Sequence, residues 1–230
     1  MMPGIADNLA RIREAMAAAC LRAGRSPESV QLVAVSKRVP VSRIQEAVAA
    51  GQRHFGENYL QEARNKIKAV AGPVIWHFIG HLQSNKAREA AALFSVVETV
   101  ERRSVAQRLH QALAAEGRRL EILVQINIGG EPQKSGVLPE AASELLAGLA
   151  TFPTLVVRGL MTIPPAADQP EASRPHFRAL ADLAADLIRQ GLLPAKDCQL
   201  SMGMSADFSI AIEEGATLVR VGTALFGCRR

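Results

Sequence analysis

The stretch 31–36, Gln-Leu-Val-Ala-Val-Ser, is a short apolar run with β-branched residues, and Lys37 follows it directly. A run of this length and composition predicts a buried strand. It comes after residues 4–23, where apolar side chains recur at spacings of four, three and four, as expected for one face of an amphipathic helix. The chain is therefore predicted to begin its sheet only after an N-terminal helix.

The same alternation of strand and helix continues outward from this stretch to residue 221. Seven further strands are predicted, over 53–55, 74–79, 94–99, 121–128, 155–161, 198–201 and 217–221. Each is separated from the next by a helical pattern, which indicates a parallel sheet, either open and doubly wound or closed into a barrel. The count of eight favours closure. We expect an α/β fold: a single (β/α)₈ TIM-type barrel domain over residues 1–230, with an extra N-terminal helix.

The composition of the 230 residues argues against several classes of protein. With 48% hydrophobic and 21% charged residues the chain is typical of a globular protein, and it has no apolar run long enough to span a membrane. The net charge of +5 is scattered, and one Trp, one Tyr and seven Phe are few for stacking on bases, so we expect no nucleic-acid partner. Cys20, Cys198 and Cys228 form no Cys-x-x-Cys motif, which favours a reducing cytoplasm.

Polar residues and glycines gather where the predicted strands end. In a (β/α)₈ barrel the functional residues lie at the C-terminal ends of the strands. Lys37 follows the first strand and Asn58 follows the second. The segment 201–205, Ser-Met-Gly-Met-Ser, comes at the end of the seventh, and Gly222-Thr223 follows the eighth. The candidate site is therefore expected at this end of the barrel.

The loops after the seventh and eighth strands are the expected phosphate site. Loops at these two positions commonly hold phosphate in such barrels. Gly203 and Gly222 would let backbone amides approach an anion, Ser205 and Thr223 would add hydroxyl donors, and a helix beginning near Ala206 would direct its N–H groups at it. Ser205 alone could simply cap that helix. The two loops together favour phosphate binding.

Lys37 and Arg220 supply the remaining chemistry. Lys37 is predicted to end an apolar strand at the functional face, where reduced hydration would expose a nucleophilic amine, although an ordinary surface lysine is the alternative. The other lysines lie in polar stretches of sequence: Lys66, Lys68, Lys86, Lys134 and Lys196. Arg220 interrupts an apolar strand and needs an acceptor, either a core carboxylate or a ligand ring nitrogen. An amine nucleophile, a phosphate cradle and an arginine donor together describe a pyridoxal 5'-phosphate (PLP) site.

A set of short motifs covers nearly the whole chain: Leu32 to Lys37, Phe55-Gly56-Glu57-Asn58, Trp76-His77-Phe78-Ile79-Gly80, Gln83-Ser84-Asn85-Lys86, Lys134-Ser135-Gly136, Arg158-Gly159-Leu160-Met161, Leu200 to Asp207 and Val219 to Gly227. In these motifs the sequence resembles the pyridoxal phosphate homeostasis protein family, which is related to the barrel domain of alanine racemase. The resemblance implies a PLP fold type III barrel with PLP on Lys37 as a Schiff base. It also implies Asn58 in the pocket, Arg220 near the pyridine ring, and phosphate near Gly203, Ser205, Gly222 and Thr223.

The resemblance further implies a cytoplasmic protein, expected to be a monomer, that binds, buffers and delivers PLP to apo PLP-dependent enzymes. Racemisation needs acid/base groups on both faces of the cofactor. Alanine racemases bring a tyrosine from a second domain, which is not expected here, and the sole tyrosine is Tyr59. We therefore expect a carrier without efficient catalysis. Two alternatives stay open: a PLP-dependent amino-acid racemase, and a Schiff-base aldolase acting on phosphorylated sugars. No metal site is expected, because His77 and His81 fall on a strand and a loop.

Overall fold

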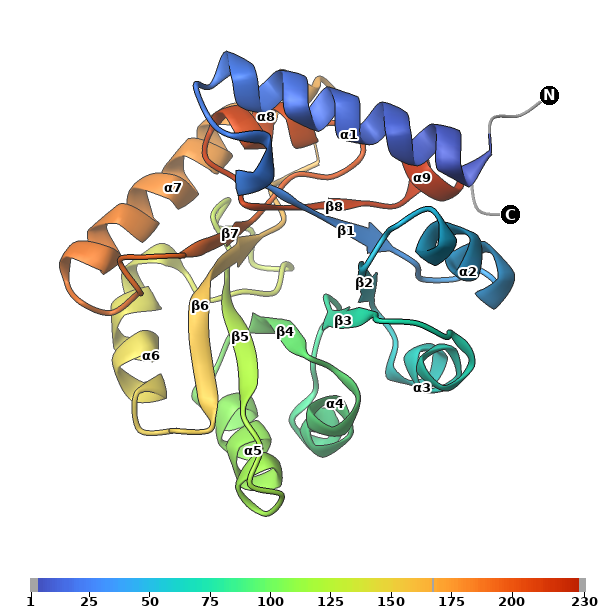
Figure 1. Ribbon diagram of the computed structural model, residues 1–230. Helices are drawn as coiled ribbons and strands as arrows, with labels where there is room; N and C mark the ends of the chain where they lie inside the picture. Colours follow the sequence, from blue (N-terminus) through green and yellow to red (C-terminus); the bar gives the residue numbers. More distant parts are fainter. Residues whose placement is uncertain (1–3, 167, 228–230) are drawn as a thin grey trace.

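Eight parallel strands form a closed barrel in chain order in the computed structural model, which describes residues 4–166 and 168–227 (Figure 1). β1 pairs with β2 on one side and with β8 on the other, which closes the barrel. The predicted (β/α)₈ barrel is thereby confirmed. The strands are β1 (Gln31–Val35), β2 (His54–Glu57), β3 (Ile75–Phe78), β4 (Val96–Val100), β5 (Leu120–Ile126), β6 (Leu155–Thr162), β7 (Gln199–Ser201) and β8 (Leu218–Val221).

One helix precedes the barrel and one α-helix follows each strand. These are α1 (Ile5–Arg22), α2 (Val41–Ala49), α3 (Leu60–Ala69), α4 (Ala87–Leu93), α5 (Arg103–Ala114), α6 (Ala142–Leu149), α7 (Arg174–Arg189), α8 (Phe208–Glu213) and α9 (Thr223–Phe226). The helix after β8, α9, has only four residues. The long α1 packs against α8, α9 and α2, and so covers the part of the barrel that α9 is too short to cover (Figure 1). Within the described residues, none of these helices is long and apolar enough to cross a membrane.

The apolar core has two parts, one between the barrel and the helices and one inside the barrel. The outer part includes the fully buried Phe55. The inner part is a small cluster of Val33, Leu123, Met161 and Leu218. Because successive side chains of a strand point to opposite faces, and residues in register share a face, Arg220 lies on the inner face with its partner Val33.

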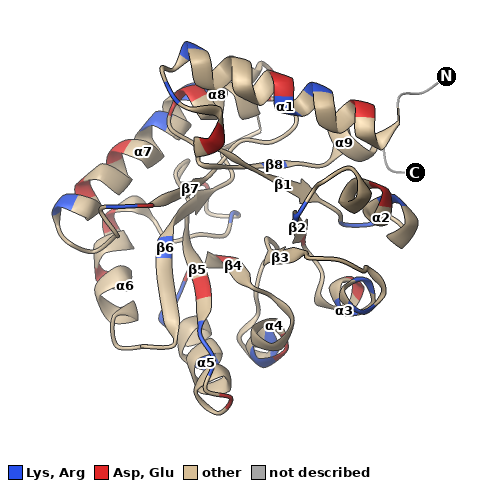
Figure 2. Cartoon of the chain, in the orientation of Figure 1, with Lys and Arg blue, Asp and Glu red and all other residues tan. Residues whose placement is uncertain are grey.

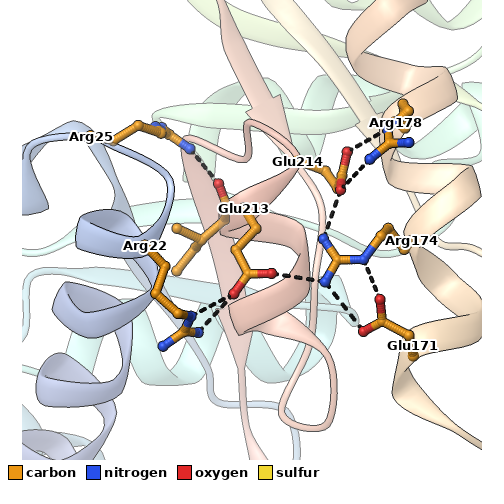
Figure 3. A network of polar contacts seen from close by, with 8 residues as sticks. Arg22, Arg25, Glu171, Arg174, Arg178, Glu213 and Glu214 are labelled. Carbon is orange, nitrogen blue, oxygen red and sulfur yellow. Dashed lines mark hydrogen bonds and ion pairs between the residues drawn. The ribbon is translucent and has the colours of Figure 1, made fainter.

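Acidic and basic residues are interspersed along the outer helices, for example on α1 and α7 (Figure 2). Where α1, α7 and α8 meet, they form a network of ion pairs (Figure 3). Arg174 of α7 contacts Glu171, and it also donates to Glu213 at 2.8 Å and to Glu214 at 2.7 Å. Arg22 of α1 reaches the same Glu213 at 2.8 Å. The end of α8 thus joins the N-terminal helix to α7.

Replacing Arg174 by Met should remove the centre of this network. We expect Arg174→Met to lower the free energy of unfolding by about 1–2 kcal/mol, a modest figure because the guanidinium is partly exposed and screened by solvent. The matched control is Arg189→Met on the same helix, where an exposed arginine pairs with Asp186. It should change stability by less than about 0.5 kcal/mol. Urea unfolding checks both values, and equal losses in the two variants would contradict a role for the network.

Candidate functional site

The seven predicted site residues come from four neighbouring strands of the barrel. Lys37 and Asn58 follow β1 and β2, and the glycine-containing loops follow β7 and β8. The strands β7, β8, β1 and β2 are consecutive around the closed barrel, although β1 and β8 are separated by nearly the whole chain. The pairing of Ala34 with Val221 near the C-terminal ends of β1 and β8 brings the lysine strand beside the strand that carries Gly222 and Thr223.

Arg220 is anchored inside the barrel by polar partners. It is 3% exposed, and its Nη1 donates to Ser201 Oγ at 2.6 Å while its Nη2 donates to the Thr162 carbonyl at 2.8 Å. Ser201 Oγ in turn donates to Oε2 of Glu98 at 2.5 Å. Of the two acceptors considered for Arg220, the structure shows the core carboxylate, reached through a serine hydroxyl. Contact with a ligand ring nitrogen stays a prediction.

A chain of hydrogen bonds continues from Glu98 toward the other end of the barrel. His77 Nδ1 donates to Oε1 of Glu98 at 2.7 Å, and His77 Nε2 lies 2.9 Å from Nδ1 of His54. Burial alone would raise the pKa of Glu98, but the hydrogen bond and charge of His77 and the charge of Arg220 outweigh it and lower that pKa. Burial, helped by the charge of His77, lowers the pKa of His54 to about 4. Glu98 is therefore the anion that balances Arg220.

The two histidines considered as metal ligands face different surroundings. His77 belongs to the interior chain, whereas His81 lies 3.0 Å from Ser135 Oγ and 3.5 Å from a carboxylate oxygen of Glu101. Among the described residues there is no group of three or more His, Cys, Asp or Glu that could hold a metal ion. The interior role of His77 was missed by sequence reasoning. Glu98 offered a signal, because a carboxylate within the apolar run 96–100 requires a buried partner.

Lys37 lies half-buried in the turn that follows β1, and a second lysine is buried close to it. This is Lys66, whose polar stretch of sequence gave no sign of its burial. Its side chain is buried, and its Nζ donates to the Ser36 carbonyl at 2.7 Å, to Glu57 at 2.8 Å and to Glu62 at 3.0 Å. Lys66 lies three residues after the buried Ala63 on α3, so the helical period could have placed it on the inner face.

The structure gives Gly203 a packing reason to be a glycine, and the close approach of a ligand there stays a prediction. Its φ is +87°, and a Cβ there would lie 2.6 Å from Cβ of Ala211 and 2.9 Å from Cα of Phe208. The glycine therefore lets the loop after β7 pack tightly against α8. Its carbonyl also accepts the Arg220 amide at 3.0 Å, which ties this loop to β8.

The expected helix start near Ala206 is also corrected. The helix α8 begins at Phe208, and the carboxylate of Asp207 accepts the Met204 amide at 2.6 Å, which stabilises a turn before the helix. Ser205 does not cap the helix: its Oγ accepts the Ala224 amide at 3.3 Å, a bond that links the loop after β7 to the loop after β8. The two loops expected to bind phosphate are therefore held together.

Asn58 is the one predicted site residue that lines a cavity of about 250 Å³. This cavity is lined by Asn58, Ile79, Gly80, His81, Gln125, Lys134, Ser135 and Ile163. Oδ1 of Asn58 is buried and has no hydrogen-bond partner within the described part of the chain. Buried acceptors are nearly always paired, so this oxygen fits a donor supplied by a bound ligand. The residues present are thus compatible with a polar cofactor at this end of the barrel.

Comparison with known proteins gives one consistent family. The family model described as "Alanine racemase, N-terminal domain" matches residues 5–230. The pyridoxal phosphate homeostasis protein of Escherichia coli strain K12 is 46% identical over 233 residues, covering 99% of this chain and 98% of its own. That of Aquifex aeolicus is 40% identical over 225 residues, covering 97% and 98%.

Solved structures agree with this assignment. The structure of PipY from Synechococcus elongatus with PLP bound is 38% identical, with a TM-score of 0.85, and the match covers 97% of this chain and 100% of that one. Alanine racemase from Corynebacterium glutamicum, at 19% identity and a TM-score of 0.67, covers 94% of this chain and 60% of that one and shows a common fold. With a full-length family match and 40–46% identity to these relatives, the chain belongs to the pyridoxal phosphate homeostasis protein family, within the alanine racemase N-terminal domain family.

Proposed function

We propose that this protein binds PLP reversibly at the C-terminal end of the barrel, linked covalently to Lys37, and that it buffers and delivers PLP without efficient catalysis. The observation that carries the proposal is the placement of Lys37, the loops after β7 and β8, and Arg220 on consecutive strands of one barrel. The names of the full-length relatives and the PLP-bound PipY structure support it.

Each residue of the proposed site has a distinct task. PLP supplies an aldehyde, with which a primary amine such as that of Lys37 forms a covalent bond. Ser205 and Thr223 would donate hydrogen bonds to the phosphate, together with backbone amides around Gly203 and Gly222. Oδ1 of Asn58, buried and unpaired among the described residues, would accept a hydrogen bond from the cofactor.

Two features support a carrier over a racemase. Arg220 near the pyridine nitrogen would keep that nitrogen unprotonated and weaken the cofactor as an electron sink. Racemisation also needs an acid/base group on the face opposite the lysine. A tyrosine is the acid/base group that alanine racemases bring from a second domain. The single tyrosine of this sequence, Tyr59, is instead 48% exposed just before α3.

The proposal extends to the setting in which the protein works. We propose a single barrel domain acting as a monomer in a reducing cytoplasm, with apo PLP-dependent enzymes as recipients. Cys20 and Cys198 are free cysteines, and burial raises the pKa of the Cys198 thiol to about 11, so this thiol stays protonated and unreactive at neutral pH. Cys228 lies outside the described residues.

Lys37 should carry the cofactor. After incubation with PLP, we expect a visible absorption band and, on borohydride reduction and peptide mapping, a pyridoxyl group on Lys37. Lys37→Ala should lose the band, whereas Lys86→Ala, which removes an exposed lysine near α4, should keep it. A label found mainly on Lys86 or Lys134 would refute the assignment, and a colourless protein would favour the aldolase.

Removing the hydroxyl of Ser205 should weaken binding of the PLP phosphate. A hydroxyl can accept the Ala224 amide and still donate its own proton. We expect Ser205→Ala to weaken PLP by about 1.5–3 kcal/mol, roughly tenfold to a hundredfold, with little effect on pyridoxal. Ser143→Ala is the control, because Ser143 is a partly exposed serine of α6, far along the chain from both loops. Equal affinities of the unmodified protein for PLP and pyridoxal would show that the loops do not recognise phosphate.

Turnover separates a carrier from a racemase. We expect PLP to pass from the loaded protein to an apo-enzyme, measured as recovered activity of that enzyme, without efficient racemisation of L-alanine or other L-amino acids, measured by optical rotation. Slow exchange through Lys37 alone is compatible with a carrier. Racemisation at the usual enzymatic rate of ~1–10³ s⁻¹ would contradict the proposal.

A further inference from the structure

The turn that carries Lys37 is held on both sides by one helix. On the N-terminal side, the carbonyl of Ser36 accepts Nζ of Lys66 at 2.7 Å. On the C-terminal side, the amide of Arg38 donates to Oε2 of Glu62 at 2.8 Å. Glu62 and Lys66 are four residues apart on α3 and form an ion pair at 3.0 Å. The two residues that flank Lys37 are therefore bound to one rigid pair of side chains.

The ammonium of Lys66 has a full set of acceptors. Its three protons match three partners, the Ser36 carbonyl, Glu57 and Glu62, and its side chain is 8% exposed. A buried ammonium is strongly destabilising when it is not paired, so the position of Nζ of Lys66 is tightly constrained. Unlike the exposed ion pairs on the outer helices, Lys66 and Glu62 bind backbone groups beside Lys37.

The partners of Lys66 are themselves fixed. Ser36 Oγ donates to Oε1 of the fully buried Glu57 at 2.6 Å, and the Ser36 amide donates to the Gly56 carbonyl at 2.9 Å. Burial would raise the pKa of Glu62, but the hydrogen bonds from the Arg38 amide and Lys66 outweigh it and hold that pKa below its ordinary range. Glu62 is therefore an anion at neutral pH and a strong acceptor for the Arg38 amide.

The backbone of the turn is strained. Arg38 has a φ of +58°, in the left-handed region that residues with a Cβ rarely occupy. Such a conformation costs free energy and persists only where the surroundings hold it. Two hydrogen bonds supply this restraint: the Arg38 amide donates to Glu62, and the Val39 amide donates to the Ser36 carbonyl at 3.0 Å.

We propose that Glu62 and Lys66 are positioning residues that fix the spacing between the Lys37 amine and the phosphate-binding loops after β7 and β8. The inference rests on the proposed function. PLP would be held at two points, the amine of Lys37 and the phosphate-binding loops. If these two points are already at the right distance, forming the first contact places the cofactor correctly for the second, and the affinity rises. PLP makes both contacts, whereas pyridoxal lacks the phosphate. The advantage of PLP over pyridoxal therefore measures how well Lys37 is positioned.

The test compares the affinity for PLP with the affinity for pyridoxal in variants of α3. We expect Glu62→Ala and Lys66→Met to reduce this ratio about tenfold, equivalent to ~1.4 kcal/mol, while attachment of pyridoxal to Lys37 changes much less. Glu62→Gln keeps an oxygen that can accept the Arg38 amide, so it should retain most of the ratio. A general loss of stability would instead weaken both ligands together and would contradict the inference.

Arg64→Met is the matched control. Arg64 lies on the same helix, but its ion-pair partner is Glu89 of α4 rather than a residue of the turn that carries Lys37. The ratio should stay unchanged in this variant. Amide hydrogen exchange in the protein without cofactor gives a second readout: exchange at Arg38 should be faster in Glu62→Ala and unchanged in Arg64→Met.

The possible failures are distinguishable. If the unmodified protein does not attach PLP to Lys37, the proposed function fails and the inference fails with it. If it does so, with a preference for PLP, but Glu62→Ala keeps the full preference, the positioning role alone is overturned. Should Lys66→Met not fold because it leaves Glu57 buried without its cation, the two Glu62 variants complete the test, since Glu62 is partly exposed.

Discussion

The pairing of β1 with β8 is the constraint on which the rest of the site depends. Four register pairs, from Gln31 with Leu218 to Ala34 with Val221, join the beginning of the sheet to its end. Without this closure, the lysine that follows β1 and the glycine loop that follows β8 would lie at opposite edges of an open sheet. With it they are neighbours. The long α1 protects this junction from outside, because it packs over α8, α9 and α2 where the helix after β8 is short.

The closed barrel contains two clusters of buried charged side chains, one inside it and one beside it. Inside the barrel, Arg220 is balanced by Glu98 through Ser201, and outside the strands, Lys66 is balanced by Glu57 and Glu62. Each buried cation is surrounded by acceptors, as the cost of an unpaired charge requires. Well-packed apolar residues could serve stability at least as well, so a functional reason is needed for these polar clusters. Their positions offer one, since each lies next to a predicted site residue or contains one.

Sequence patterns were sufficient for the fold and insufficient for these clusters. Strand and helix periods are local, so the eight strands, the N-terminal helix and the strand-end position of Lys37 could be predicted from short windows. The partner of a buried charge is not local: Ser201 and Glu98 are 103 residues apart, and Arg220 and Thr162 are 58 apart. The same limit applies to Lys66, whose polar sequence neighbours concealed its burial and its contact with Ser36, 30 residues away. Gly203 was singled out as a phosphate-loop residue, whereas the packing against α8 that requires a glycine there is a tertiary contact, which short sequence windows do not show.

The two buried clusters have different effects in a protein that, under the proposed function, both holds and releases a cofactor. The interior cluster keeps Arg220 in place as a charged donor, which under the proposed function weakens the electron sink without adding a covalent bond. The cluster on α3 acts on the backbone around Lys37, where the left-handed Arg38 is held by its hydrogen bond to Glu62. A covalent bond to an amine is strong enough to hold PLP, yet it is reversible by exchange with another amine or with water. A rigid turn therefore suits capture, and the reversible chemistry of the amine, rather than opening of the barrel, suits release.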